Sequence, residues 1–274
     1  MDFIHEIIQY KFLTNALFAS LLSGIACGII GTYVVCRRLV FLSGGITHSS
    51  FGGIGIAYYM GWNPILGALV FAVLSALGIE TASDRGRMRE DSAIGIVWSV
   101  GMAIGIIFIY LTPGYAPNLM SFLFGNILTV TGGDILALAG LDVVILLLFL
   151  LALRPVMYVA FDREFARSQG IPTRTISYFM AVLVALTIVL SIRTVGIVLL
   201  ISLLTIPPVI VNTLSKSYRK ITWWAAVVAT LGNLTGLYFS YEFNIPAGAA
   251  TIFALTLTLI VVKLLPLCCK SLKP

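Results

Sequence analysis

Long apolar runs separated by short polar gaps fill almost the whole chain. A helix needs about 20 mostly apolar residues to cross the hydrocarbon core of a bilayer, with a range of about 17–25. Runs of this length therefore predict about nine membrane-spanning helices, near residues 12–36, 47–61, 64–81, 92–111, 134–153, 175–192, 195–213, 222–241 and 247–265. The second run is short and rich in glycine, so a total of eight spans is the alternative.

The basic residues lie in every second gap between these runs. Of the seventeen Lys and Arg residues, only Lys11 and Arg193 fall in the other gaps. Short loops rich in Lys and Arg stay in the cytoplasm. The pattern therefore predicts an all-α, multi-pass membrane protein with an odd number of spans, its N-terminus outside and its C-terminus in the cytoplasm. We expect residues 1–274 to form a single transmembrane domain.

Composition agrees with this prediction and narrows the classes of function. Charged residues make up 10% of the chain, against roughly 25% in an ordinary soluble domain. The net charge of +6 is explained by membrane topology and does not require a nucleic-acid partner. The chain has no GxxxxGK[ST] phosphate-binding loop, no HExxH and no GxSxG, so an enzyme is the weaker class.

The second span carries the first candidate for binding chemistry. Its small residues at helical spacing let neighbouring backbones approach closely; they are Gly45, Ser49, Gly52 and Gly53. His48 lies beside this face, and an ionisable group at membrane depth usually faces a cavity or a partner. Neutral imidazole is a common ligand for divalent transition metals. The alternative is that His48 bonds a neighbouring helix and only fixes packing.

Two further spans hold unusual residues. Asp142 lies about 8 residues, or about 12 Å, into the fifth span, where a carboxylate should be paired, protonated or in contact with water. Pro207 and Pro208 lie inside the seventh span and lack the N–H groups that a helix needs. We expect them to kink or break that helix, either as a hinge or as a bend that fits the bundle.

The longest cytoplasmic gap, residues 154–174, predicts a short helix of about two turns. Asp162 is suited to cap its N-terminus and Gly170 to end it. Phe161 and Phe165 would then lie on one side at i and i+4. Such a helix either lies on the membrane surface or docks a cytoplasmic partner.

Eight stretches distributed over most of the chain carry a family resemblance: residues 31–35, 37–42, 47–50, 90–96, 123–128, 162–170, 195–196 and 206–208. Each is weak alone, but their order and spacing resemble the ABC-3-type transmembrane permeases of ATP-binding-cassette importers for zinc, manganese or iron.

This resemblance implies a homodimer that encloses a central path in the bacterial inner (plasma) membrane. It implies two cytoplasmic ATPase subunits, which bind ATP and magnesium, and an extracytoplasmic metal-binding lipoprotein. The chain itself would be non-catalytic, would bind no cofactor of its own and would pass a divalent metal. The candidate residues for the metal path are His48, Gly44 and, from its depth in the fifth span, Asp142. Those implied for coupling to the ATPase are Asp162, Glu164, Phe165, Ala166 and Gly170.

The chain departs from the family pattern at one position. Many members carry an acid four residues before the histidine, and here that position is Gly44. His48 alone cannot neutralise a divalent ion, so the cation stays open and a metal chelate or another small solute is an alternative cargo. An ion-coupled secondary carrier would rely on Asp142 and would not need the helix at 162–170. A membrane scaffold would leave His48 and that helix without a role.

The predicted topology can be tested by labelling. A cysteine at Pro117 or Asn244 should react with an impermeant thiol reagent in intact cells, and one at Ser83 or Ser217 should not, because the basic gaps stay inside. Labelling of position 83 in sealed cells would overturn the arrangement.

Overall fold

The computed structural model of this chain describes residues 3–84, 86, 88–113 and 130–271, and every long element in these ranges is an α-helix. The segment that the sequence analysis left out of the spans, 116–133, lies mostly outside them. The helices are α1 (Phe3–Gln9), α2 (Lys11–Cys36), α3 (Val40–Tyr59), α4 (Pro64–Asp84), α5 (Glu90–Leu111), α7 (Gly132–Phe161), α8 (Arg163–Ser168), α9 (Thr173–Val195), α10 (Ile197–Leu214), α11 (Tyr218–Phe243) and α12 (Ala247–Ser271).

Seven of the described helices are long and apolar enough to cross a membrane: α2, α4, α5, α7, α9, α10 and α12. This confirms the all-α membrane fold. The other two predicted spans correspond to α3 and α11, which have 20 and 26 residues but are not among those seven. The total of nine spans and their orientation therefore stay predictions.

The second predicted span begins earlier than expected. Helix α2 ends at Cys36, Arg38 adopts a left-handed backbone with φ 59°, and α3 starts at Val40 instead of residue 47. Glycine-rich sequence disfavours a helix locally, but α3 buries its glycines between neighbouring helices, so packing extends it. As a result His48 lies in the middle of α3 and not near its beginning.

The fifth predicted span, which ends at residue 153, stops close to a kink in α7. The backbone is not helical at Ala152, and a further helical segment that contains Pro155 continues to Phe161. A proline removes one helical hydrogen bond, and the backbone adjusts at Ala152, which has φ −121° and ψ 25°. Phe161 therefore ends α7 and does not share a helix with Phe165, which corrects the prediction that both lie on one face of the short helix.

The seventh span does not break at its two prolines. Helix α10 (Ile197–Leu214) is continuous through Pro207 and Pro208, and both prolines are buried. Of the expected kink or break, a break is therefore absent, because the packing of α10 against α2, α11 and α12 supports the helix on either side, and a kink stays a prediction. Whether the two prolines form a hinge stays a prediction.

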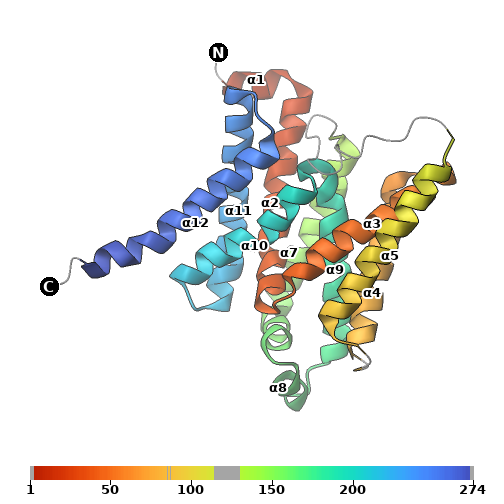
Figure 1. Cartoon of the computed structure of the whole chain (residues 1–274). Coiled ribbons are helices and arrows are strands. Elements are labelled where there is room, and N and C mark those ends of the chain that lie inside the picture. Colours follow the sequence, from red (N-terminus) through yellow and green to blue (C-terminus); the bar gives the residue numbers. More distant parts are fainter. Residues whose placement is uncertain (1–2, 85, 87, 114–129, 272–274) are drawn as a thin grey trace.

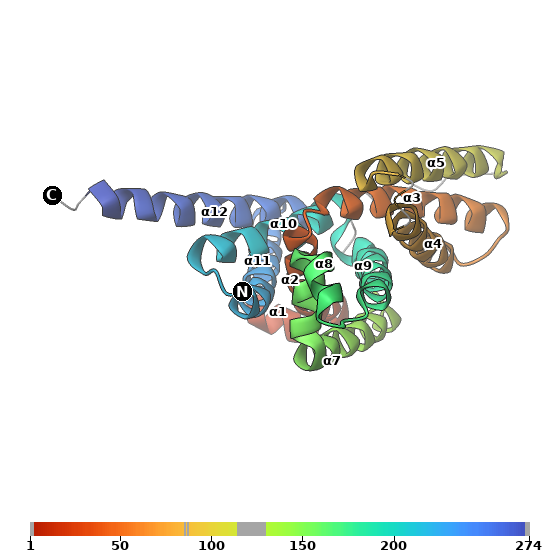
Figure 2. The same cartoon turned by 90° about the horizontal axis from the view of Figure 1, so that it is seen from below.

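Helices α3, α4 and α5 form one side of the molecule, and α11 and α12 lie on the other, with α10 in contact with α3 between them (Figures 1 and 2). Their backbones touch at glycines. A Cβ atom built on Gly53 would lie 2.0 Å from the carbonyl oxygen of Gly67 in α4, and one on Gly55 would lie 2.5 Å from that of Gly105 in α5. The small-residue face predicted for α3 is therefore confirmed, and there is no room for a side chain at these contacts.

The other side of the molecule is built on α2, which packs against α11. Asn233 of α11 donates hydrogen bonds from Nδ2 to the Ser20 carbonyl oxygen (3.0 Å) and to Ser23 Oγ (3.1 Å) of α2. Interhelical hydrogen bonds of this kind hold membrane helices together. Helix α12 extends away from the bundle (Figure 1).

The contact between α3 and α4 yields a stability prediction. The change Gly53→Ala should destabilise the protein by about 1–3 kcal/mol, because the nearest atoms are the backbone carbonyl group of Gly67, which cannot rotate away, so the helices must separate. Gly95→Ala in α5 is the matched control, since nothing lies within 4 Å of its Cβ position. Thermal unfolding of the purified protein in detergent measures both. Equal midpoints for the two variants would contradict the direct backbone contact.

Candidate functional site

His48 lies half-buried on α3 and its ring is stacked on Trp98 of α5. The two ring centroids are 4.5 Å apart and the ring planes differ by 6°. The glycine contacts between α3 and α5 bring these helices close enough for the two rings to meet. The stack covers one face of the imidazole and fixes its orientation.

Gly44 lies one helical turn before His48 on the same face of α3. A Cβ atom at Gly44 would lie 3.5 Å from Cζ3 of Trp98 and 4.0 Å from Cδ1 of Ile201 in α10. These are ordinary van der Waals distances, so a small side chain fits, whereas a longer one must pass the indole ring. Trp98 thus lies against both positions, 44 and 48.

The sequence analysis missed Trp98. No spacing rule links it to His48, because the two residues lie on different helices and meet only through the packing of α3 on α5. The available signal was weak: an aromatic residue within an apolar run that also contains glycines at helical spacing, Gly101 and Gly105.

Asp142 lies on α7 and is 3% exposed. Both of its carboxylate oxygens are buried without a hydrogen-bond partner among the described residues. It lies close enough to Cys27 of α2 for an electrostatic interaction, and the Cys27 thiol in turn contacts Ser191 Oγ of α9 at 3.8 Å. His48 lies on α3 with its ring against α5, whereas Asp142 lies on α7. The structure therefore does not bring His48 and Asp142, both predicted for the metal path, together.

Within the part of the chain that the structure describes, no three His, Cys, Asp or Glu side chains are grouped so that they could hold a metal ion. One copy of the chain therefore offers His48 as a ligand without an acidic neighbour on the same helix face. Further ligands for an ion at His48 would have to come from another type of residue, from a residue that the structure does not describe or from another molecule.

The short helix predicted in the cytoplasmic gap is present as α8, Arg163–Ser168. The Asp162 carboxylate accepts a hydrogen bond from the Phe165 backbone N–H at 3.0 Å, which confirms the N-cap. Gly170 has φ +74°, a backbone conformation that favours glycine, and so ends the helix as expected. In Figure 1, α8 lies at the opposite end of the bundle from α1.

The exposed face of α8 is not the predicted pair Phe161 and Phe165, because Phe161 belongs to α7. Ala166 is fully buried against the protein, whereas Phe165 is 48% exposed and the Glu164 side chain is 85% exposed. Phe165 packs edge-on against Tyr158 of α7. The face available to a partner therefore centres on Glu164 and Phe165, and Ala166 contributes only to packing within the chain.

Several charged residues meet beneath α8, and the sequence analysis did not connect them. Glu80 of α4 forms ion pairs with Arg163 of α8 and with Arg37, which follows α2. Arg37 also pairs with Glu90 of α5 at 3.4 Å and donates a hydrogen bond to Tyr33 OH at 3.0 Å. Burial by itself would lower the pKa of Arg37, but Tyr33 and Glu90 outweigh this effect and the pKa is raised. Arg37 therefore remains charged although its side chain is only 8% exposed.

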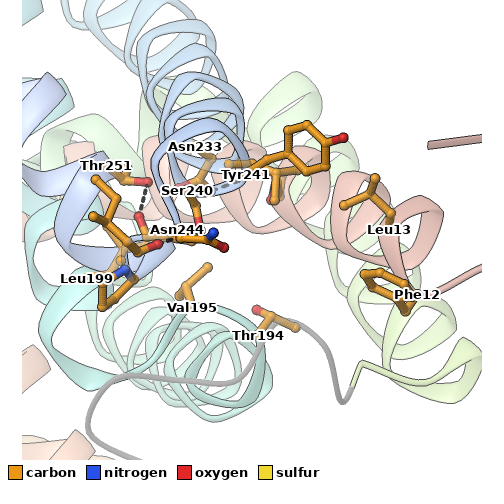
Figure 3. A pocket seen from close by; sticks show the side chains of 16 residues that line it. Phe12, Leu13, Thr194, Val195, Leu199, Asn233, Ser240, Tyr241, Asn244 and Thr251 are labelled. Carbon is orange, nitrogen blue, oxygen red and sulfur yellow. Dashed lines mark hydrogen bonds between the residues drawn. The ribbon is translucent and has the colours of Figure 1, made fainter. Parts of the chain in front are cut away.

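A cavity of about 460 Å³ lies near the other end of the bundle, between α2, the junction of α9 and α10, and the junction of α11 and α12. Figure 3 shows Ser240, Asn244 and Thr251 gathered in it. Asn233 also lines the cavity, and its Oδ1 is buried without a hydrogen-bond partner among the described residues. His48 does not line this cavity.

Comparison with known proteins places these features in a family. The ABC 3 transport family matches residues 9–265. The chain belongs to this family. Relatives include the manganese transport system membrane protein MntC of Halalkalibacterium halodurans, 34% identical, with 92% of this chain and 89% of that protein covered. Another is a probable iron transport system membrane protein of Haemophilus influenzae, 30% identical, with 92% of each covered.

A solved structure is similar to this chain in both fold and sequence. The structure of PsaBC from Streptococcus pneumoniae in complex with Fab contains a chain that superposes with a TM-score of 0.83 at 27% identity, covering 95% of this chain and 94% of that one. The resemblance drawn from the short sequence stretches is thereby confirmed for the family and for the fold.

Proposed function

We propose that this chain is the transmembrane permease subunit of an ABC importer for divalent metal cations, with manganese, zinc and iron as the candidates. The observation that carries the proposal is similarity over more than nine-tenths of the chain to membrane proteins named for manganese and iron transport. The permease would form one domain with about nine spans in the bacterial inner membrane, its N-terminus outside.

In this proposal the chain is non-catalytic and binds no cofactor of its own. Two cytoplasmic ATPase subunits hydrolyse ATP with magnesium, and an extracytoplasmic lipoprotein delivers the metal to a homodimer of permeases. The position of α8 at one end of the bundle, with Glu164 and Phe165 exposed, supports its role as the coupling helix.

His48 is the proposed ligand in the path. A bare divalent cation cannot cross a dry helix bundle, because the cost of removing its water far exceeds any gain from packing. Imidazole can replace part of that hydration, and a second copy of the chain would supply a second His48. Asp142 remains a separate candidate, since it lies on another helix, α7, and is buried there.

Uptake into liposomes tests the function and the role of His48 together. The complex of permease, ATPase and lipoprotein should import at least one of the three metals with ATP, and His48→Ala should abolish or strongly reduce uptake without loss of assembly. His5→Ala is the matched control, because His5 is exposed on α1. Uptake by His48→Ala at the parental rate would make His48 a packing residue, and uptake of a chelate alone would change the cargo.

The same assay can test Gly44. The change Gly44→Asp places a carboxylate one turn from His48 and should strengthen retention of divalent ions and shift the preference among them. Because Trp98 lies 3.5 Å from the Cβ position, the indole must move or the carboxylate must pass beside it. An unchanged metal preference would mean that position 44 does not reach the path.

A further prediction concerns docking of the ATPase. Phe165→Asp should reduce co-purification of the ATPase subunit and metal uptake, because burying a phenylalanine against a partner contributes roughly 1.5–3 kcal/mol and a carboxylate reverses this gain. Phe243→Asp is the control, since Phe243 is 62% exposed at the far end of α11. Full subunit binding and uptake in Phe165→Asp would refute the coupling role of α8.

A further inference from the structure

Two ion pairs join α8 to α4, one helical turn apart. Arg163 pairs with Glu80, and Arg167 Nη2 lies 3.7 Å from Asp84 Oδ1. Residues at i and i+4 share one face of a helix, so two turns of α8 face two turns of α4. Arg174, at the start of α9, also pairs with Asp84 at 3.2 Å. We call the pairs Arg163–Glu80 and Arg167–Asp84 the charge ladder.

The Arg163–Glu80 pair is the buried part of the ladder. The side chains of Glu80 and Arg163 are 5% and 23% exposed. Glu80 also contacts Arg37 at 3.7 Å, and Arg37 contacts Glu90, so two positive and two negative charges lie together. A buried charge is strongly unfavourable when its partner is removed. A shift of α8 relative to α4 would therefore separate Arg163 from Glu80 and leave the buried Glu80 with only the more distant Arg37 as its partner.

Helix α4 is in turn fixed to the helix that bears His48. The backbones of α3 and α4 touch at Gly53 and Gly67, and those of α3 and α5 touch at Gly52 and Gly101. Close-packed backbones of this kind move together, because no flexible side chain lies between them. A displacement of α8 that the ladder transfers to α4 therefore reaches His48 through contacts between rigid elements.

We propose that Glu80 and Arg163 are positioning residues that transmit movement of α8 to the helix bearing His48. The inference rests on the proposed function, because it takes α8 to be the segment that the ATPase moves. It goes beyond docking: Phe165 would bind the partner, whereas the ladder would carry the partner's movement into the membrane.

The test is a double-mutant cycle in the complete reconstituted complex. The variants are Glu80→Gln, Arg163→Gln and both together, and the readouts are metal ions imported per ATP hydrolysed and the amount of ATPase bound. Each single change should lower the ions imported per ATP by about tenfold or more while the ATPase remains bound. The double variant should be no worse than the worse single one, because the pair can be broken only once.

The matched control is Asp91→Asn, next to Glu90 in the first turn of α5; Asp91 is exposed and forms no ion pair among the residues described. Single variants that match this control, or effects that add in the double variant, would overturn the proposal. So would a loss of uptake that follows loss of bound ATPase, because the residues would then serve docking alone. If Glu80→Gln does not assemble, Arg163→Gln decides, since its side chain is partly exposed.

A measurement that does not depend on metal transport distinguishes failure of this inference from failure of the proposed function. If the parental complex imports none of the three metals, the proposed function fails, and Trp98→Cys then reports on the ladder. The rate of thiol labelling at position 98 is measured with and without ATP, and labelling of the four parental cysteines is subtracted. The rate should change with ATP when the charge ladder is intact, and it should not change with ATP when Arg163→Gln is added. An equal response, or none with the ladder intact, would overturn the ladder's role.

Discussion

Direct backbone contact between α3 and its neighbours is the constraint on which the candidate site depends. In a bilayer the hydrophobic effect does not drive helices together, so association relies on close packing and hydrogen bonds. Helix α3 is not among the seven described helices that are apolar enough to span by composition, and its glycines let it pack against α4 and α5 instead. The same contacts place the imidazole of His48 4.5 Å from the indole of Trp98.

The opposite requirement holds at the end of the bundle that carries α8, where charges are buried and must be balanced. Glu80 of α4 lies between Arg37, which follows α2, and Arg163 of α8, so three segments of the chain meet at one carboxylate. The arrangement is costly to break and contributes little net stability, because desolvation offsets much of the attraction. Its effect is to define how α8 sits on the bundle, which is the property that a transmitted movement requires.

The site itself is unusual in what it lacks. An acid is absent at position 44, and Trp98 lies against the face that Gly44 and His48 share. A single copy of the chain therefore presents an imidazole stacked on an indole ring, with no acid beside it. Imidazole suits zinc and iron as well as other transition metals, whereas manganese favours carboxylate and carbonyl oxygen. If the chain acts as the proposed homodimer, the cargo would depend on what the second copy contributes and on whether Trp98 holds its place.

The sequence by itself determined the features that depend on local chemistry. The length of the first apolar run predicted a span at 12–36, and the observed α2 is Lys11–Cys36. Asp162 and Gly170 likewise predicted the two ends of α8. Both predictions succeeded because the length of a span and the cap of a helix depend on adjacent residues. Only the tertiary structure decided where α3 begins, that α7 passes through Pro155, and that Trp98 meets His48. Glu80 and Arg163 are 83 positions apart, and no local pattern links them. Contacts of this kind arise only when helices that are remote in the sequence pack together.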